Sequence, residues 1–248
     1  FPTTSVIAPF NINPQIIMWD PATYPDVKTI ADLKATGAKV RYFGGTAYMD
    51  YFTSTGILDP AQVDGGYDGT PANFVADGGK SAQQGFATSE PYFYENVLTD
   101  WGKPVAYQTI HDAGWTSYAQ TLAAKPETIV SAADCLKLLV PIIQQAQVDY
   151  VADPSTTNAL ILDLVAQYNN GWMYDAGQAD AAVALALENG LIANSPDGTL
   201  GSFDSQRMDE FLALAIPIFE GLGEKLKPGL TSADLATNQF IDPTIALP

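Results

Sequence analysis

The chain has 248 residues, of which 47% are hydrophobic and 11% aromatic, a composition typical of a globular protein rather than a disordered one. Its formal net charge at pH 7 is −17, with only 11 lysine and arginine residues. Binding to nucleic acid or to an anionic membrane surface needs clustered basic side chains, so the composition argues against both kinds of partner. The sequence has no apolar run of about 18 residues, the length expected of a membrane-spanning segment.

Extended runs open the chain at residues 4–10 and 14–19, and the first helix is predicted at 29–37. Thr29 and Asp32 have the spacing of a capping pair at the start of that helix.

Strand-like and helix-like runs alternate between residues 28 and 110, and the strands lead into turns rich in glycine, threonine and serine. This alternation predicts the α/β class, with a parallel sheet and helices on both of its faces. Strands are predicted at 38–43, 83–87 and 104–110, and the intervening helices at 46–56, 71–79 and 91–102.

The character of the chain changes after residue 125, where long helical patterns replace the alternation. Pro141 is expected to kink the first of these helices. Cys135, in the same helix, is the only cysteine and is expected to be a small buried hydrophobic residue. Helices are predicted at 126–154, 154–171, 178–190 and 204–223.

Gly44, Gly45 and Thr46 lie between a predicted strand and a predicted helix. Backbone N–H groups and the helix dipole at such a place can receive a carboxylate, a phosphate or a polar ring atom. The alternative is a tight structural turn in which Thr46 caps the helix.

Thr88, Ser89, Glu90 and Tyr92 occupy the equivalent turn after the strand at 83–87. Glu90 is placed to accept hydrogen bonds from an amine or amidine, and Tyr92 to stack on the same ligand. The alternative is that Ser89 caps the helix and Glu90 only interacts favourably with its first turn.

Tyr67 and Asp68 form a third such turn, whose alternative is a simple Asp-Gly turn before a helix. Trp19, Trp115 and Trp172 each lie in or beside a turn with a polar neighbour. We therefore predict that these aromatic residues contribute to the wall of a site for a planar ligand.

The sequence offers no catalytic constellation. His111 is the only histidine, and the adjacent Asp112 should point away from it on an extended chain. With one histidine and one cysteine, no metal site is predicted. We expect no catalytic residue, metal or cofactor.

Several of these segments together resemble solute-binding proteins of bacterial ABC importers. The resemblance is to the group related to binders of thiamine-pyrimidine precursors, nitrate and sulfonates. It is carried by IIMWDP, KTIADLKATGAKVRYF, GGTAYMDYF, the segment from Gly66 to Glu95, and the tail LTSADLATNQFIDPTIAL.

The resemblance implies a type II periplasmic-binding-protein fold, with two α/β lobes joined by a hinge and extra C-terminal helices. Residues 1–13 would be the hinge or the end of the first lobe, 14–110 the second lobe, and 111–248 the return to the first. Family members usually carry a longer opening segment of the first lobe, so this chain is expected to begin near the second. The turns at residues 44–46 and 88–90 match places where family members contact solute, and Trp19 and Trp115 would lie near the lobe crossings.

The resemblance further implies an extracytoplasmic protein, periplasmic or extracellular, with or without a lipid anchor. We expect a monomer that captures a small polar or heteroaromatic solute and delivers it to an ABC importer permease. A sulfonate or nitrate-like anion reaching Arg41 is the alternative ligand. The alternative functions are a sensory ligand-binding domain, and an enzyme using Glu90, Asp68 or His111 as general acid or base.

Overall fold

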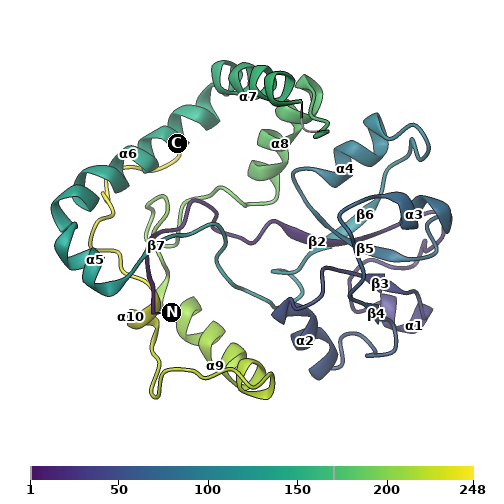
Figure 1. Ribbon diagram of the computed structural model, residues 1–248, viewed down its shortest axis with the longest axis horizontal. Helices are drawn as coiled ribbons and strands as arrows, with labels where there is room; N and C mark the ends of the chain where they lie inside the picture. The colour runs from purple at the N-terminus through teal and green to yellow at the C-terminus, as the bar shows by residue number, and fades with distance from the viewer. Residues whose placement is uncertain (1, 170) are drawn as a thin grey trace. The chain divides into compact units, whose positions relative to one another are not determined.

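The computed structural model describes residues 2–169 and 171–248 and divides into two compact units. Unit 1 comprises Phe1–Asn13, Ser117–Leu214 and Leu226–Pro248, and unit 2 comprises Pro14–Thr116 and Ala215–Lys225. The class is mixed α/β, with a five-stranded mixed sheet and several helices (Figure 1). Among the described residues, none of the helices is both long enough and apolar enough to span a membrane.

The five-stranded sheet belongs to unit 2 and has the strand order β4-β3-β5-β2-β6. β3 pairs in parallel with both β4 and β5, whereas β2 pairs antiparallel with both β5 and β6. The strands are β2 (Gln15–Trp19), β3 (Val40–Arg41), β4 (Val63–Asp64), β5 (Ala82–Phe86) and β6 (Ala106–Thr109).

The direction of β2 corrects the expectation of a fully parallel sheet. Ile17 lies opposite Gln84 of β5 on one side and Gln108 of β6 on the other, in antiparallel register on both. A strand that is buried on both faces has the same apolar composition whichever way it runs, so its direction cannot be read from the sequence. β4, whose two residues precede a glycine-rich turn, was also not predicted.

Helices cover both faces of this sheet. Ile16, Ile17 and Met18 are consecutive on β2 and therefore point to alternate faces, yet all three are fully buried. Phe52 and Phe74, on two of the covering helices, are buried to the same extent. The helical segments are α1 (Leu33–Thr36), α2 (Ala47–Ser54), α3 (Ala72–Ala76), α4 (Glu90–Tyr92), the π-helical η1 (Phe93–Val97) and the second half of α9 (Ser205–Gly221).

The predicted capping pair forms as expected before α1. Asp32 Oδ2 accepts the Thr29 N–H at 2.8 Å, and the Asp32 N–H donates to Thr29 Oγ1 at 3.3 Å. Regular helix, however, covers only Leu33–Thr36 of the predicted range 29–37.

Unit 1 combines a two-stranded antiparallel sheet with most of the long helices (Figure 1). Val6 and Ile7 pack with Leu136, Val140 and Phe240 in one core cluster. The elements are β1 (Thr4–Ile7), β7 (Leu122–Ala124), α5 (Pro126–Ser131), α6 (Ala133–Ala152), α7 (Ser155–Tyr168), α8 (Ala176–Glu188), the first half of α9 and α10 (Ser232–Leu235).

Two details of the first long helix differ from the prediction. The helix is interrupted at Ala132, which separates α5 from α6. α6 then continues through Pro141. Cys135 is exposed rather than buried. The side of α6 that faces the core is marked by Leu136 and Val140, four residues apart, so the neighbouring position 135 falls on a different side.

Candidate functional site

The candidate site lies at the carboxyl end of the sheet in unit 2, where β3, β4 and β5 all end. The turns 44–46, 66–68 and 88–90 follow these three strands in order. The chain goes from β3 to β4 on one side and then to β5 on the other side of β3, so the strand order reverses between β3 and β5. Open α/β sheets bind ligands at the carboxyl end of the strands, beside such a switch point.

The turn after β3 needs its glycines. The Gly44 N–H donates to the Gly65 carbonyl at 3.1 Å, and a side chain at Gly44 would place its Cβ only 3.1 Å from that oxygen. Gly45 has φ of 84°, in the left-handed region. Thr46 precedes α2, but its hydroxyl does not cap the helix, and Oγ1 is buried without a hydrogen-bond partner. Thr46 therefore occupies the N-cap position of the alternative interpretation without making its side-chain capping bond.

A buried glutamine of β5 fixes the same turn. Gln84 Oε1 accepts the Phe43 N–H at 3.0 Å and the Tyr48 hydroxyl at 2.7 Å. Burial raises the pKa of Tyr48. The sequence analysis did not single out Gln84, although a glutamine pair inside an apolar strand is a signal of buried hydrogen bonding.

The turn after β5 is held by Glu90. Its Oε2 accepts the Phe86 N–H at 2.6 Å, so the side chain folds back over the end of the strand. Gly85 makes this possible, because a Cβ there would lie 2.9 Å from the Glu90 Cγ. Burial raises the pKa of Glu90, while the hydrogen bonds from the Phe86 and Glu90 N–H groups lower it; the net direction is upward. Ser89 stands at the N-cap position of α4 without a side-chain capping bond.

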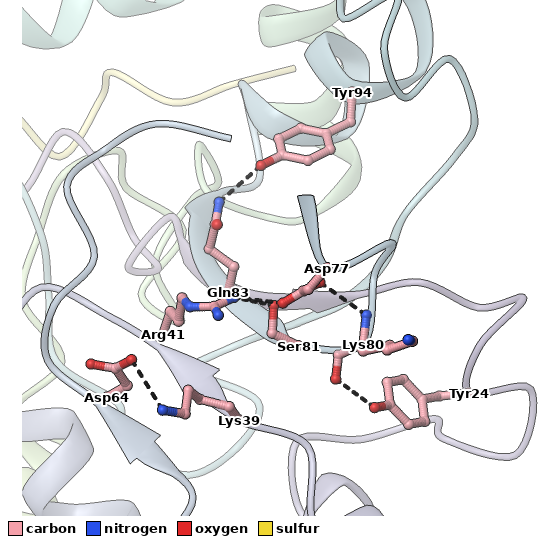
Figure 2. A network of polar contacts seen from close by, with 9 residues as sticks. All are labelled: Tyr24, Lys39, Arg41, Asp64, Asp77, Lys80, Ser81, Gln83 and Tyr94. Carbon is pink, nitrogen blue, oxygen red and sulfur yellow. Dashed lines mark hydrogen bonds and ion pairs between the residues drawn. The ribbon is translucent and has the colours of Figure 1, made fainter. Parts of the chain in front are cut away.

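Two buried tyrosines are electrostatically coupled to Glu90. Gln83 Nε2 donates to the Tyr94 hydroxyl at 2.9 Å (Figure 2), and the Tyr67 ring packs against Phe43 with centroids 4.8 Å apart. Burial raises the pKa of both tyrosines, and the Glu90 charge raises it further in each case. A carboxylate of raised pKa therefore lies near two neutral phenol groups at the end of β5.

Asp68 forms the simple turn that was the alternative interpretation. Its Oδ1 accepts the Thr70 N–H at 2.9 Å and the Thr70 hydroxyl at 2.8 Å. These two hydrogen bonds lower the pKa of Asp68.

Arg41 is engaged away from this end of the sheet. Its Nη1 contacts Asp77 Oδ2 at 2.8 Å and also donates to Ser81 Oγ (Figure 2). Ser81 directly precedes β5, so the guanidinium is directed toward the amino end of the sheet, where the parallel strands begin.

Trp19 and Trp115, both in unit 2, lie at opposite ends of its sheet. Trp115 follows β6 and packs against Tyr51 with ring centroids 5.8 Å apart. Trp19 ends the antiparallel β2 at the amino end of the sheet and is only 1% exposed, so the direction of β2 separates it from the three turns. Trp172 belongs to unit 1, where it is 57% exposed and stacked on Tyr174.

The remaining residues of the β5 turn are half-buried. Thr88 begins this turn, directly before Ser89. Tyr92 lies in the helical segment that follows, where its carbonyl accepts the Asn96 Nδ2–H at 3.1 Å. The following π-helical turn, η1, is a form that is frequent at functional sites.

Two phenylalanines at this end were missed by the sequence analysis. Phe43 follows β3 and is 41% exposed, and Phe86 closes β5 and is 37% exposed. An exposed phenylalanine looks the same in sequence as a core residue, so only the structure reveals it.

The groups at this end of the sheet are suited to contacts with a small molecule. In residues 2–169 and 171–248, no three His, Cys, Asp or Glu side chains are grouped to hold a metal ion. His111 and Asp112 lie in the turn after β6, where the Asp112 N–H donates to Thr109 Oγ1. Backbone N–H groups, hydroxyls, aromatic faces and one carboxylate are the groups available to a ligand.

Comparison with known proteins shows a similar fold but no family. No family model matches the chain, and no curated protein does. A solved structure of a protein from Bordetella bronchiseptica RB50 superposes with a TM-score of 0.51 at 16% identity, covering 96% of this chain and 72% of that one. At this identity the likeness concerns the fold alone.

Proposed function

We propose that the protein is an extracytoplasmic solute-binding protein of the type II periplasmic-binding-protein fold, which delivers a small polar or heteroaromatic molecule to an ABC importer. Solute capture involves no covalent chemistry. In this proposal the solute favours the conformation that binds it more tightly, by its differential affinity for that conformation.

One observation carries the proposal. Three turns rich in glycine, threonine and serine follow three parallel strands. All three turns therefore lie at the carboxyl end of the same sheet, beside the point where the strand order reverses. Sheets of this kind hold ligands at that place.

The charges near these turns favour a neutral or cationic ring compound over an anion. Arg41 is bound to Asp77 at the other end of the sheet, whereas Glu90 is a carboxylate at the site itself. Phe43 and Phe86 offer exposed aromatic surface on which a heterocycle can stack.

The first test is mass spectrometry of the purified protein under native and then denaturing conditions. We expect a small molecule that stays with the folded chain and is released only on denaturation. A bare chain that also fails to bind thiamine-pyrimidine precursors, nitrate or sulfonates in calorimetry would contradict the proposal.

The variant Glu90→Gln tests the contribution of the carboxylate to solute binding. A glutamine oxygen can still accept the Phe86 N–H, so the substitution removes charge while keeping the turn. For a cationic solute we expect affinity to fall by about 1–3 kcal/mol. Glu95→Gln is the matched control, because Glu95 is exposed and only five positions along the same segment. Equal affinities of the two variants would show that Glu90 only holds the turn.

A further inference from the structure

Unit 2 has a recess beside α2, apart from the candidate turns. Its volume is about 420 Å³, within the range of small-molecule sites. Its walls come from one side of α2 between Asp50 and Ser54, from the end of α9 and from Pro60 in the loop after α2. The lining residues are Asp50, Thr53, Ser54, Pro60, Pro217, Ile218, Gly221 and Leu222.

The apolar part of the recess is exposed hydrophobic surface. Pro60, Pro217, Ile218 and Leu222 form it, and Leu222 is 50% exposed although it is a large aliphatic side chain. Covering these side chains with an apolar group would remove them from water.

The polar part of the recess consists of hydrogen-bond acceptors. Thr53 Oγ1 donates its proton to the Met49 carbonyl at 3.0 Å, and Ser54 Oγ donates to the Tyr51 carbonyl at 3.2 Å. Both hydroxyls have therefore used their single donor and have only lone pairs to offer. Asp50 adds a carboxylate, which no basic side chain among the described residues approaches within ion-pairing distance.

The two helix ends add to the negative potential. α2 ends at Ser54 and α9 ends at Gly221, and both ends line the recess. The C-terminus of a helix carries partial negative charge on its last carbonyl groups. Lys34 binds the Gly56 carbonyl at 2.8 Å, beyond the end of α2, and is not one of the lining residues.

We infer that this recess is a binding site for a small organic cation with an apolar body, such as an alkylammonium. The ammonium group donates to Asp50 and to the hydroxyls of Thr53 and Ser54. The alkyl body covers the prolines, Ile218 and Leu222. This inference does not depend on the proposed solute site, because none of the residues of the turns 44–46, 66–68 and 88–90 lines the recess.

Isothermal titration calorimetry with three probes of equal length tests the inference. Hexylammonium and hexanol carry the same six-carbon chain with a positive or a neutral head, and hexanoate has the same overall length with a negative head. We expect hexylammonium to bind, hexanol to bind more weakly, and hexanoate not to bind. Equal binding of hexylammonium and hexanol, or no binding of either, would overturn the inference.

Two variants in the recess and one control variant outside it locate the bound probe. Asp50→Asn should weaken hexylammonium by about fivefold, the effect expected of one half-exposed ion pair, while leaving hexanol unchanged. Asp100→Asn makes the same charge change at an exposed position of unit 2 outside the recess and should leave both probes unchanged. Leu222→Trp should obstruct the recess and abolish binding. If Asp50→Asn and Asp100→Asn bind hexylammonium equally, the site is not here. Circular dichroism of each variant confirms that it is folded.

Discussion

The two ends of the sheet in unit 2 differ in how their carboxylates are partnered. At the amino end, Asp20 is 1% exposed and accepts hydrogen bonds from Ala22, Thr23 and Lys103. Lys103 also lies over the Trp101 ring, 4.1 Å from its centroid. At the carboxyl end, glycines and phenylalanines are exposed and a carboxylate has a raised pKa. The contacts of Asp20 stabilise the amino end, whereas the carboxyl end exposes groups that a ligand can contact.

The largest expected effect comes from adding a methyl group at each end. Gly79 has φ of 74°, and a Cβ there would lie 2.6 Å from the Trp101 ring and 2.7 Å from the Asp20 Cβ. Gly79→Ala should lower the free energy of unfolding by about 3 kcal/mol. Gly45→Ala meets nothing within 4 Å and should cost only about 1 kcal/mol, from the left-handed backbone alone. Urea denaturation of both variants measures the difference, and equal losses would contradict this comparison.

Removing the charge of Asp20 should have the next largest effect. Asp20→Asn keeps one acceptor oxygen but presents an amide to Lys103, and we expect a loss of about 1–3 kcal/mol of unfolding free energy. Asp26→Asn is an exposed control in the same unit that should change little. If the two variants unfold at the same urea concentration, the Asp20 network does not stabilise the amino end.

The two ends should also respond to pH with opposite signs. Burial raises the pKa of Asp20, but the hydrogen bonds from Lys103, Ala22 and Thr23 outweigh it, so the pKa is lowered from 3.8. Its stabilising contribution is therefore present above pH 3.8 and is lost as the pH falls through the lowered value. The pKa of Glu90 is raised from 4.5, so the folded state holds its proton longer, and its contribution falls as the pH rises above 4.5.

Unfolding free energies measured from pH 3 to 7 test this contrast. As the pH rises above 4.5, the unfolding free energy of Glu90→Gln should increase relative to that of the wild type. This is the smallest of the three effects, because the Glu90 side chain is half-buried and solvent weakens its interactions. A difference that does not depend on pH would mean that Glu90 titrates normally.

The sequence predicted local features better than their arrangement in space. Glycine turns, the Thr29–Asp32 capping pair and the long helices follow from short-range chemistry and are present. The direction of β2 depends on β5 and β6, which lie far along the chain. The local pattern around Trp19 therefore could not show that Trp19 lies at the end of the sheet opposite to the three turns.

The candidate site was predictable to a similar degree. The three turns do meet at one end of one sheet, as expected from their positions after strands. The hydrogen bonds of Gln83 and Gln84, and the exposure of Phe43 and Phe86, depend on which face of a strand is covered and by what. That information is not present in the local pattern.

The antiparallel β2 has a consequence for the order in which the chain can fold. Ile16 pairs with Gly85 and Thr109, so β2 has no partner strand until β5 has been synthesised and has only one until β6 emerges. Unit 1 must wait longer, because Thr4 donates to the Asp234 carbonyl and Leu200 donates to the Ile245 carbonyl. Non-local pairing of this kind slows folding and leaves apolar strands unpaired meanwhile. We therefore expect the sheet of unit 2 to form during synthesis before unit 1 can close.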